Sequence, residues 1–136
     1  MQTTLRATGP LPAPAAWERY ADLDLWSHWA PQISGVSVTG GHRRLHQGLQ
    51  GTVRAAGVVH VPFEVLAVDE AARTWSWRVR VGPITLHLEH GVEDPGPDDG
   101  PRVGARTWLR TTGPAPVVLA YAPLALIALH SLLLER

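Results

Sequence analysis

Alternating apolar and polar positions predict that much of the chain forms β-strands. The first expected strand covers residues 3–8 and stops at Gly9-Pro10. A second includes Val36 and Val38 and ends at Gly40-Gly41. Between turn sequences rich in Gly, Pro and Asp, five more strands are expected over residues 52–56, 60–68, 74–81, 84–91 and 103–112.

Helical spacing of apolar residues occurs in two parts of the chain. The stretch PAAWERYADLDLWSHWAP places Trp17 and Tyr20 on one face, with Asp22 as an N-cap candidate and Pro31 as a stop, and predicts two short helices. Residues 113–134 contain no charged side chain and predict one long C-terminal helix.

This order of elements indicates an α+β fold. The strands follow one another while the helices come near the two ends, which favours an antiparallel sheet of about seven strands covered on one face by helix. A length of 136 residues with 45% hydrophobic content is enough for one core. We therefore expect a single domain over residues 1–136, with a curved sheet around the long helix.

The turn at Gly82-Pro83 fixes the expected register of two strands, if these are the central residues of a tight hairpin. Val81 then opposes Ile84, Val79 opposes Leu86, Trp77 opposes Leu88, and Trp75 opposes His90. All eight lie on one face, and the other face carries polar residues that include Arg78, diagonal to Glu89. A slip of one residue would place tryptophans against arginines, so this register is strongly favoured.

His90 is the one titratable group on this apolar face. One interpretation is a histidine at the edge of the core, hydrogen-bonded to a neighbour. The other is a residue that contacts a ligand or transfers a proton. We take Trp75, Trp77, Leu86 and Leu88 as the apolar wall of a ligand site beside it.

The strand at residues 60–68 is apolar on both faces, so its orientation is less constrained. Matching apolar partners places Phe63 beside Trp77 and Val65 beside Trp75, and leaves Glu64 outside near Arg78. The opposite orientation would put Glu64 into the pocket as a candidate base. We favour the first, because burying an unpaired carboxylate is costly.

The long helix has a bulky side and a small side. The bulky side carries Leu119, Leu126, Leu129, Leu133 and Leu134. The small side carries Tyr121, Ala125, Ala128 and Ser131, and it either borders a cavity, with Tyr121 supplying a hydroxyl, or allows close packing on the sheet. Leu124, Ala125, Ala128 and Trp26 complete the predicted ligand-binding set.

Composition excludes several classes of function. The chain has no Lys and no Cys, which removes Schiff-base, thiolate and disulfide chemistry. Zero net charge argues against nucleic acid as a partner. His42, His46 and His60 are better interpreted as solvated loop residues than as metal ligands, so no metal and no cofactor is expected.

The uncharged helix is also about as long as a membrane-spanning segment needs to be. Pro123, His130 and the need of a one-layer sheet for a covering helix argue against a tail anchor. The N-terminus lacks the pattern of a signal peptide. We expect a cytoplasmic protein, monomeric or homodimeric, that does not enter the membrane.

Several segments together resemble the START-like helix-grip superfamily, and within it the polyketide cyclase/dehydrase-like (SRPBCC) domains of bacteria. These segments are APAAWERYADLDLWSHWAP, GLQGTVR, VPFEVLAVDEAARTWSWRVRVGP, LEHGV and the apolar helix after TTGPAP. The resemblance covers nearly the whole chain. It implies a deep cavity between a bent sheet and the C-terminal helix, entered near the short helices and the loops, for lipids, polyketides or other hydrophobic molecules.

Three functions are compatible with these features. The first is cofactor-free cyclisation, dehydration or isomerisation of a polyketide-like substrate, with His90 as the principal catalytic candidate and Tyr121 and Glu64 as secondary ones. The second is a carrier that binds a hydrophobic metabolite without changing it. The third is an assembly partner that uses an exposed sheet edge or Trp108.

Overall fold

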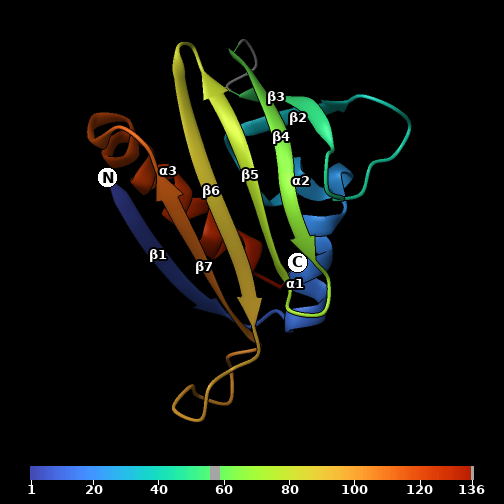
Figure 1. Ribbon diagram of the computed structural model, residues 1–136. Helices are drawn as coiled ribbons and strands as arrows, with labels where there is room; N and C mark the ends of the chain where they lie inside the picture. The colour runs from blue at the N-terminus through green and yellow to red at the C-terminus, as the bar shows by residue number, and fades with distance from the viewer. Residues whose placement is uncertain (56–58, 136) are drawn as a thin grey trace.

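The computed structural model describes residues 1–55 and 59–135, so Ala56, the last residue of one expected strand, lies outside the described residues. These described residues form a seven-stranded sheet with three helices and one short 3-10 turn (Figure 1). The strands are β1 (Gln2–Gly9), β2 (Ile33–Val38), β3 (Gln50–Ala55), β4 (Val59–Asp69), β5 (Thr74–Val81), β6 (Ile84–Glu93) and β7 (Ala105–Thr112). The helical segments are α1 (Ala13–Ala21), η1 (Leu23–Leu25), α2 (Trp26–Trp29) and α3 (Ala115–Leu132).

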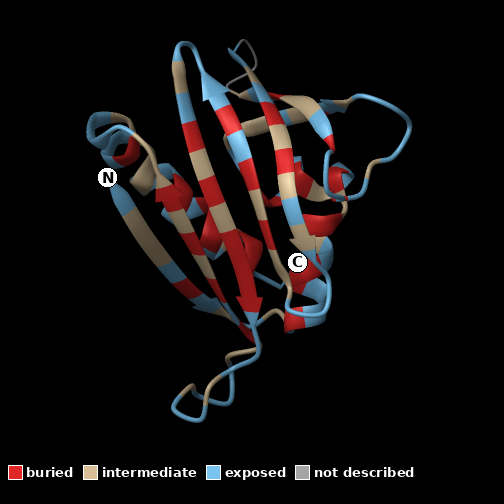
Figure 2. Cartoon of the chain, in the orientation of Figure 1, coloured by how far each residue is buried: buried red, intermediate tan, exposed pale blue. Residues whose placement is uncertain are grey.

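All neighbouring strands of the sheet are antiparallel, in the order β1-β7-β6-β5-β4-β3-β2. Figure 1 shows the helices together on one side of the curved sheet, with α3 crossing behind β1, β7 and β6. Figure 2 shows buried and exposed positions alternating along the central strands, as expected when one face is covered. The predicted α+β helix-grip architecture is therefore confirmed.

The β5–β6 hairpin has the predicted register, with Trp77 opposite Leu88 and Trp75 opposite His90. Gly82 has a φ of 61°, a left-handed value that glycine adopts without the steric cost of a side chain. On the outer face, Arg78 lies opposite His87 and therefore diagonal to Glu89, and Glu64 lies opposite Arg78, both as predicted. Arg78 is bonded to Glu64 at 2.6 Å, while Glu89 lies 3.7 Å from Arg110.

The β4 strand has the predicted orientation but a different register. Phe63 lies opposite Val79 and Val65 lies opposite Trp77, so each is shifted by one inward-facing position from the expected partner. The pairing also changes register between Val65 and Ala67, which is a β-bulge that places Val68 opposite Trp75. Apolar matching could not detect this shift, because several apolar residues are equivalent partners.

The α3 helix turns its small side to the interior. Ala125 and Ala128 are buried, whereas Leu119 and Ile127 are more than half exposed. Small side chains let the helix approach the sheet closely, and the bulky side is left largely outward except at Leu129 and Leu133. Leu132 is buried as well. The helix is long and apolar enough to cross a membrane by length and composition, with a mean hydropathy of 1.8 and 28% of its residues buried.

Arg19 of α1 fixes the C-terminal end of α3. Its Nη1 atom donates hydrogen bonds to the carbonyl oxygens of Leu132 and Leu134, both at 2.7 Å. The cation thus lies at the negative end of the helix dipole. On the other side, the backbone N–H of Leu11 donates to the carbonyl of Leu133 at 3.0 Å. These contacts position α3 over the sheet and define the space between them.

Candidate functional site

A cavity of about 320 Å³ lies between the inner face of the sheet, the α2 region and α3. The sheet contributes Val53, Ala55, Val59, Val61, Trp75, Trp77, Val79, Val81, Leu86, Leu88, His90 and Leu109. The helices and the segment after α2 contribute Trp26, Trp29, Gln32, Ile33, Tyr121, Leu124, Ala125, Ala128 and Leu129. Nearly all of these side chains are apolar, so the cavity is suited to a hydrophobic molecule.

The exposed lining residues show where the cavity opens. Val59, Val81 and Leu124 are between 42% and 50% exposed, although each also lines the cavity. Val81 precedes the β5–β6 turn, Val59 begins β4, and Leu124 lies in the middle of α3. The opening is thus bordered by strand ends and by the helix. Gln32 and Ile33, which follow α2, line the cavity from the helical side.

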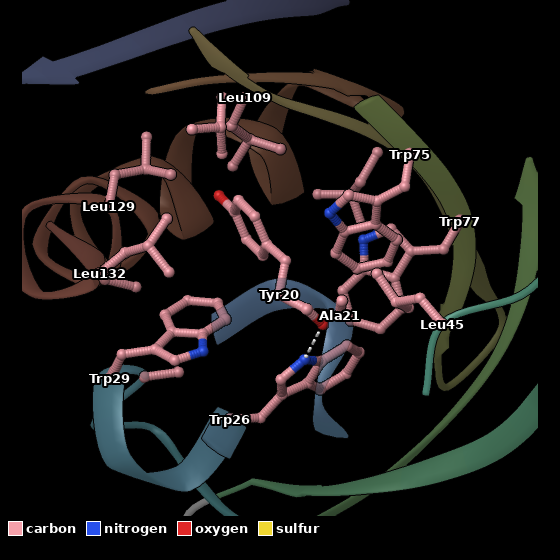
Figure 3. Close-up of a cluster of buried hydrophobic side chains, with 14 of the residues drawn as sticks. Tyr20, Ala21, Trp26, Trp29, Leu45, Trp75, Trp77, Leu109, Leu129 and Leu132 are labelled. Atoms are coloured by element: carbon pink, nitrogen blue, oxygen red, sulfur yellow. Dashed lines mark hydrogen bonds between the residues drawn. The ribbon is translucent and has the colours of Figure 1, made fainter. Parts of the chain in front are cut away.

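Aromatic rings form one wall of the cavity. The Trp26 ring centroid lies 5.7 Å from that of Trp75 and 5.3 Å from that of Trp77. Phe63 packs behind them, with its ring centroid 5.3 Å from that of Trp77. Figure 3 shows these strand tryptophans facing Tyr20, and also the hydrogen bond from Trp26 Nε1 to the Tyr20 carbonyl. Rings held by several neighbours make a stiff wall.

His90 belongs to a chain of hydrogen bonds with a fixed direction. Trp77 Nε1 can only donate, and it lies 3.1 Å from His90 Nε2, which therefore accepts. In a neutral imidazole the proton is then on Nδ1, which donates to the Tyr20 hydroxyl at 3.2 Å. Tyr20 donates in turn to Thr107 Oγ1 at 3.4 Å, and Thr107 donates to the Gly91 carbonyl at 2.8 Å.

Burial keeps the side chains of this hydrogen-bond chain neutral. His90 is 5% exposed and stacks on Trp75, with ring centroids 4.6 Å apart. Removal of the imidazole from water lowers the pKa of His90 to about 3. Burial likewise raises the pKa of Tyr20 well above its ordinary value. Both side chains are therefore neutral at physiological pH.

Tyr121 has a different environment. It lines the cavity from α3 beside Ala125 and Ala128, and burial raises the pKa of its hydroxyl to about 12. Among the residues that the structure describes, none is hydrogen-bonded to this hydroxyl. Tyr121 thus offers the cavity a neutral donor and acceptor whose bonding capacity is not used within the described protein.

The structure brings most of the predicted ligand-binding residues together. Trp75, Trp77, Leu86, Leu88, Trp26, Leu124, Ala125 and Ala128 all line the cavity. Phe63 and Val65 are buried but do not line it; Phe63 packs against Trp26 and Trp77, with ring centroids 5.9 Å and 5.3 Å away. His90 and Tyr121 line it as expected.

Glu64 does not reach the cavity, so the favoured outward orientation is found and the alternative, Glu64 as a candidate base in the pocket, is not. It lies on the outer face, where Arg78 and Gln50 are bonded to it and hold the pKa of its carboxyl below the ordinary value. Trp108 is also on the outer face. Its ring lies against Gly91, with the Arg110 guanidinium 5.6 Å from the ring centroid.

Sequence reasoning missed two groups of residues. Trp29, Val79, Leu109 and Leu129 line the cavity, but recognising them required knowledge of which strands and helices meet. Tyr20 and Thr107 were missed as partners of His90. A signal for Tyr20 was present, since a tyrosine on the apolar face of a helix needs a partner for its hydroxyl.

The side chains of the lining show whether the cavity could hold a charged cofactor or a metal. In residues 1–55 and 59–135, no Arg, Asp or Glu lines the cavity. The described residues also contain no group of three or more metal-ligating side chains, although the rings of His42 and His46 lie 6.0 Å apart. The site is therefore suited to recognise a ligand by its shape and apolar surface, not by its charge.

The family model described as polyketide cyclase / dehydrase and lipid transport matches residues 2–125. The chain belongs to this family. The predicted membership of the SRPBCC superfamily is thereby confirmed, and it supports the binding of small hydrophobic ligands. A comparison with curated proteins finds no significant match.

Solved structures show the same fold at low sequence identity. Ara h 8.0201 is 14% identical, with a TM-score of 0.73, and the alignment covers 97% of this chain and 94% of that protein. A protein from Nitrosospira multiformis is 15% identical, with a TM-score of 0.71, and the alignment covers 95% and 94%. The match supports the helix-grip architecture over nearly the full length of this family member.

Proposed function

We propose that this protein binds a small hydrophobic molecule in the cavity and carries it without changing it. The observation that supports this most directly is the closed hydrogen-bond chain of His90. Trp77 occupies one ring nitrogen and Tyr20 occupies the other, so the imidazole has no free lone pair to act as a base. A pKa of about 3 also makes it a poor proton acceptor from a substrate.

The rest of the lining supports the same reading. General acid–base catalysis needs paired groups whose pKa values lie near the working pH. Tyr121 is too weak an acid for that role, with a pKa of about 12, and Glu64 lies outside the cavity. Apolar walls, by contrast, suffice for binding, since each Å² of apolar surface removed from water contributes roughly 25 cal/mol.

Native mass spectrometry of protein purified from its own host tests this proposal. We expect a small molecule to copurify, and to be recovered unchanged after incubation with the protein. Ala125→Phe should abolish the bound mass, because a phenyl ring would fill the cavity from α3. Ala120→Phe is the matched control, since Ala120 is exposed on the same helix and the bound mass should persist.

The alternative is catalysis of the kind named in the family description. It predicts conversion of the bound molecule, and loss of that conversion in His90→Gln while binding is retained. Conversion that depends on His90 would overturn the carrier proposal. If no molecule copurifies and added apolar compounds do not bind the folded protein, the binding proposal itself fails.

A further inference from the structure

We infer that the ligand is an uncharged, mostly apolar molecule with one hydrogen-bonding oxygen, and that the Tyr121 hydroxyl holds this oxygen. The inference rests on the proposed binding function and deepens it. It follows from which polar atoms of the lining are already bonded within the protein, and which are free to meet a ligand.

The indole nitrogens of the cavity wall are committed to the fold or inaccessible. Trp26 donates to the Tyr20 carbonyl and Trp29 to the Arg19 carbonyl, both at 2.8 Å. Trp77 donates to His90. Trp75 Nε1 has no partner among the described residues, but it is buried without accessible surface, so a ligand cannot reach it in this conformation.

Tyr121 differs from these groups. Its ring lines the cavity, and its hydroxyl is not among the buried unpartnered atoms of the described residues, although none of them is bonded to it. In an otherwise apolar cavity, this accessible hydroxyl can form a hydrogen bond with an oxygen atom of the ligand. Gln32 lines the cavity from the segment after α2, and its amide is likewise not bonded to the described residues, so the test below isolates the Tyr121 hydroxyl.

The charge of the lining limits the ligand further. Within the described chain no charged side chain lines the cavity, so a carboxylate or an ammonium group would lose its water without gaining a counter-charge. Tyr121 remains neutral, since burial raises the pKa of its hydroxyl to about 12. A neutral phenol donates well to a ketone, ester, ether or alcohol oxygen.

The volume sets the size of the ligand. About 320 Å³ is at the lower end of the range of roughly 300–1,000 Å³ found for small-molecule sites. A fused two-ring compound or a short chain is of this order, whereas a two-chain lipid is not.

Equilibrium dialysis with two probes of the same shape tests the inference. The probes are 2-acetylnaphthalene, which carries a ketone, and 2-isopropenylnaphthalene, in which a methylene group replaces the oxygen. We expect Tyr121→Phe to weaken binding of the ketone roughly two- to tenfold, the effect of one net hydrogen bond, and to leave binding of the alkene unchanged. The carboxylate 2-naphthoate should not bind at neutral pH.

Tyr20→Phe is the matched control, because it removes the other tyrosine hydroxyl of the chain, which is already bonded to His90 and Thr107 and belongs to a residue outside the lining. It should leave the ratio of the two affinities unchanged in protein that is still folded. Equal effects of Tyr121→Phe on both probes, or no effect on either, would overturn the inference while the binding function stands. Binding of neither probe by the folded wild-type protein would overturn both.

Discussion

Trp77 and His90 are diagonal neighbours on the inner face of the β5–β6 hairpin, and Trp77 Nε1 donates a hydrogen bond to His90 Nε2 at 3.1 Å. The residue directly opposite His90 is Trp75, which stacks on the imidazole ring. One tryptophan thus fixes the tautomer of the histidine and the other excludes water from its face. The histidine that was the best catalytic candidate in the sequence is held as part of the structure.

The buried neutral state of His90 predicts a dependence of stability on pH. Its pKa is about 3 in the folded protein and about 6.5 in an unfolded chain, so between these values the unfolded state binds more protons. Stability is therefore fully present above about pH 6.5 and is lost as the pH falls toward 3. The loss approaches about 1.4 kcal/mol per pH unit.

Urea denaturation of wild-type protein and His90→Gln from pH 4 to pH 8 checks this. We expect the wild-type curve to fall more steeply with acid than that of the variant. The difference between the two curves isolates His90 from the carboxylates that both proteins share. Parallel curves would mean that His90 is not held neutral by burial.

Replacing each of the two tyrosines by Phe is expected to change the free energy of unfolding by a different amount. Tyr20→Phe removes the acceptor of the His90 Nδ1 proton and leaves that donor buried, which should lower the free energy of unfolding by about 1–3 kcal/mol. Tyr121→Phe removes a hydroxyl that has no bond to the described residues, so a change within about 0.5 kcal/mol is expected. Chemical denaturation without added ligand measures both.

The sequence was sufficient to predict the fold, because the strongest signals were local. The Gly82-Pro83 turn and the alternation on both sides of it determined which residues of β5 and β6 share a face. The bulge in β4 left no such mark, since Val65, Ala67 and Val68 are all acceptable apolar neighbours for the tryptophans of β5. Where no tight turn joins two strands, as between β4 and β5, side-chain packing sets their register, and that packing cannot be inferred from the sequence alone.

The candidate site was predictable as a surface but not as a chemical environment. His90 was correctly placed on the apolar face, and Tyr121, Ala125 and Ala128 of the predicted small side line the cavity, together with Leu129, which was placed on the bulky side. Whether His90 is free or bonded depended on Tyr20, which is 70 residues away in the chain. Long-range contacts of this kind decide pKa values, and no periodicity encodes them.

Arg19 is expected to be a strong determinant of stability. Its guanidinium donates to carbonyl groups at the end of α3, and replacing it by Met would leave those groups without this charged partner. We expect a loss of about 1.5–3 kcal/mol, as for hydrogen bonds to charged groups. Arg80→Met, at an exposed position of β5, is the control and should change stability little. Equal losses in both variants would contradict the structural role of Arg19.

The outer side of α3 predicts a contrast between two leucines of one helix. Leu119 is 58% exposed, whereas Leu132 is completely buried. Leu132→Ala should lower the free energy of unfolding by about 2–5 kcal/mol through lost packing and a cavity. Leu119→Ala should cost less than about 0.5 kcal/mol, because its side chain is largely in water and alanine favours a helix.

The measurement is chemical denaturation at two protein concentrations, together with sedimentation to detect assembly. Leu119 and Ile127 are both more than half exposed, so we expect that replacing both by Gln lowers any concentration-dependent assembly through this face. If Leu119→Ala instead costs as much as Leu132→Ala, Leu119 is not in water under those conditions. Because self-association depends on concentration, a cost that disappears on dilution would identify another copy of the chain as what covers this face.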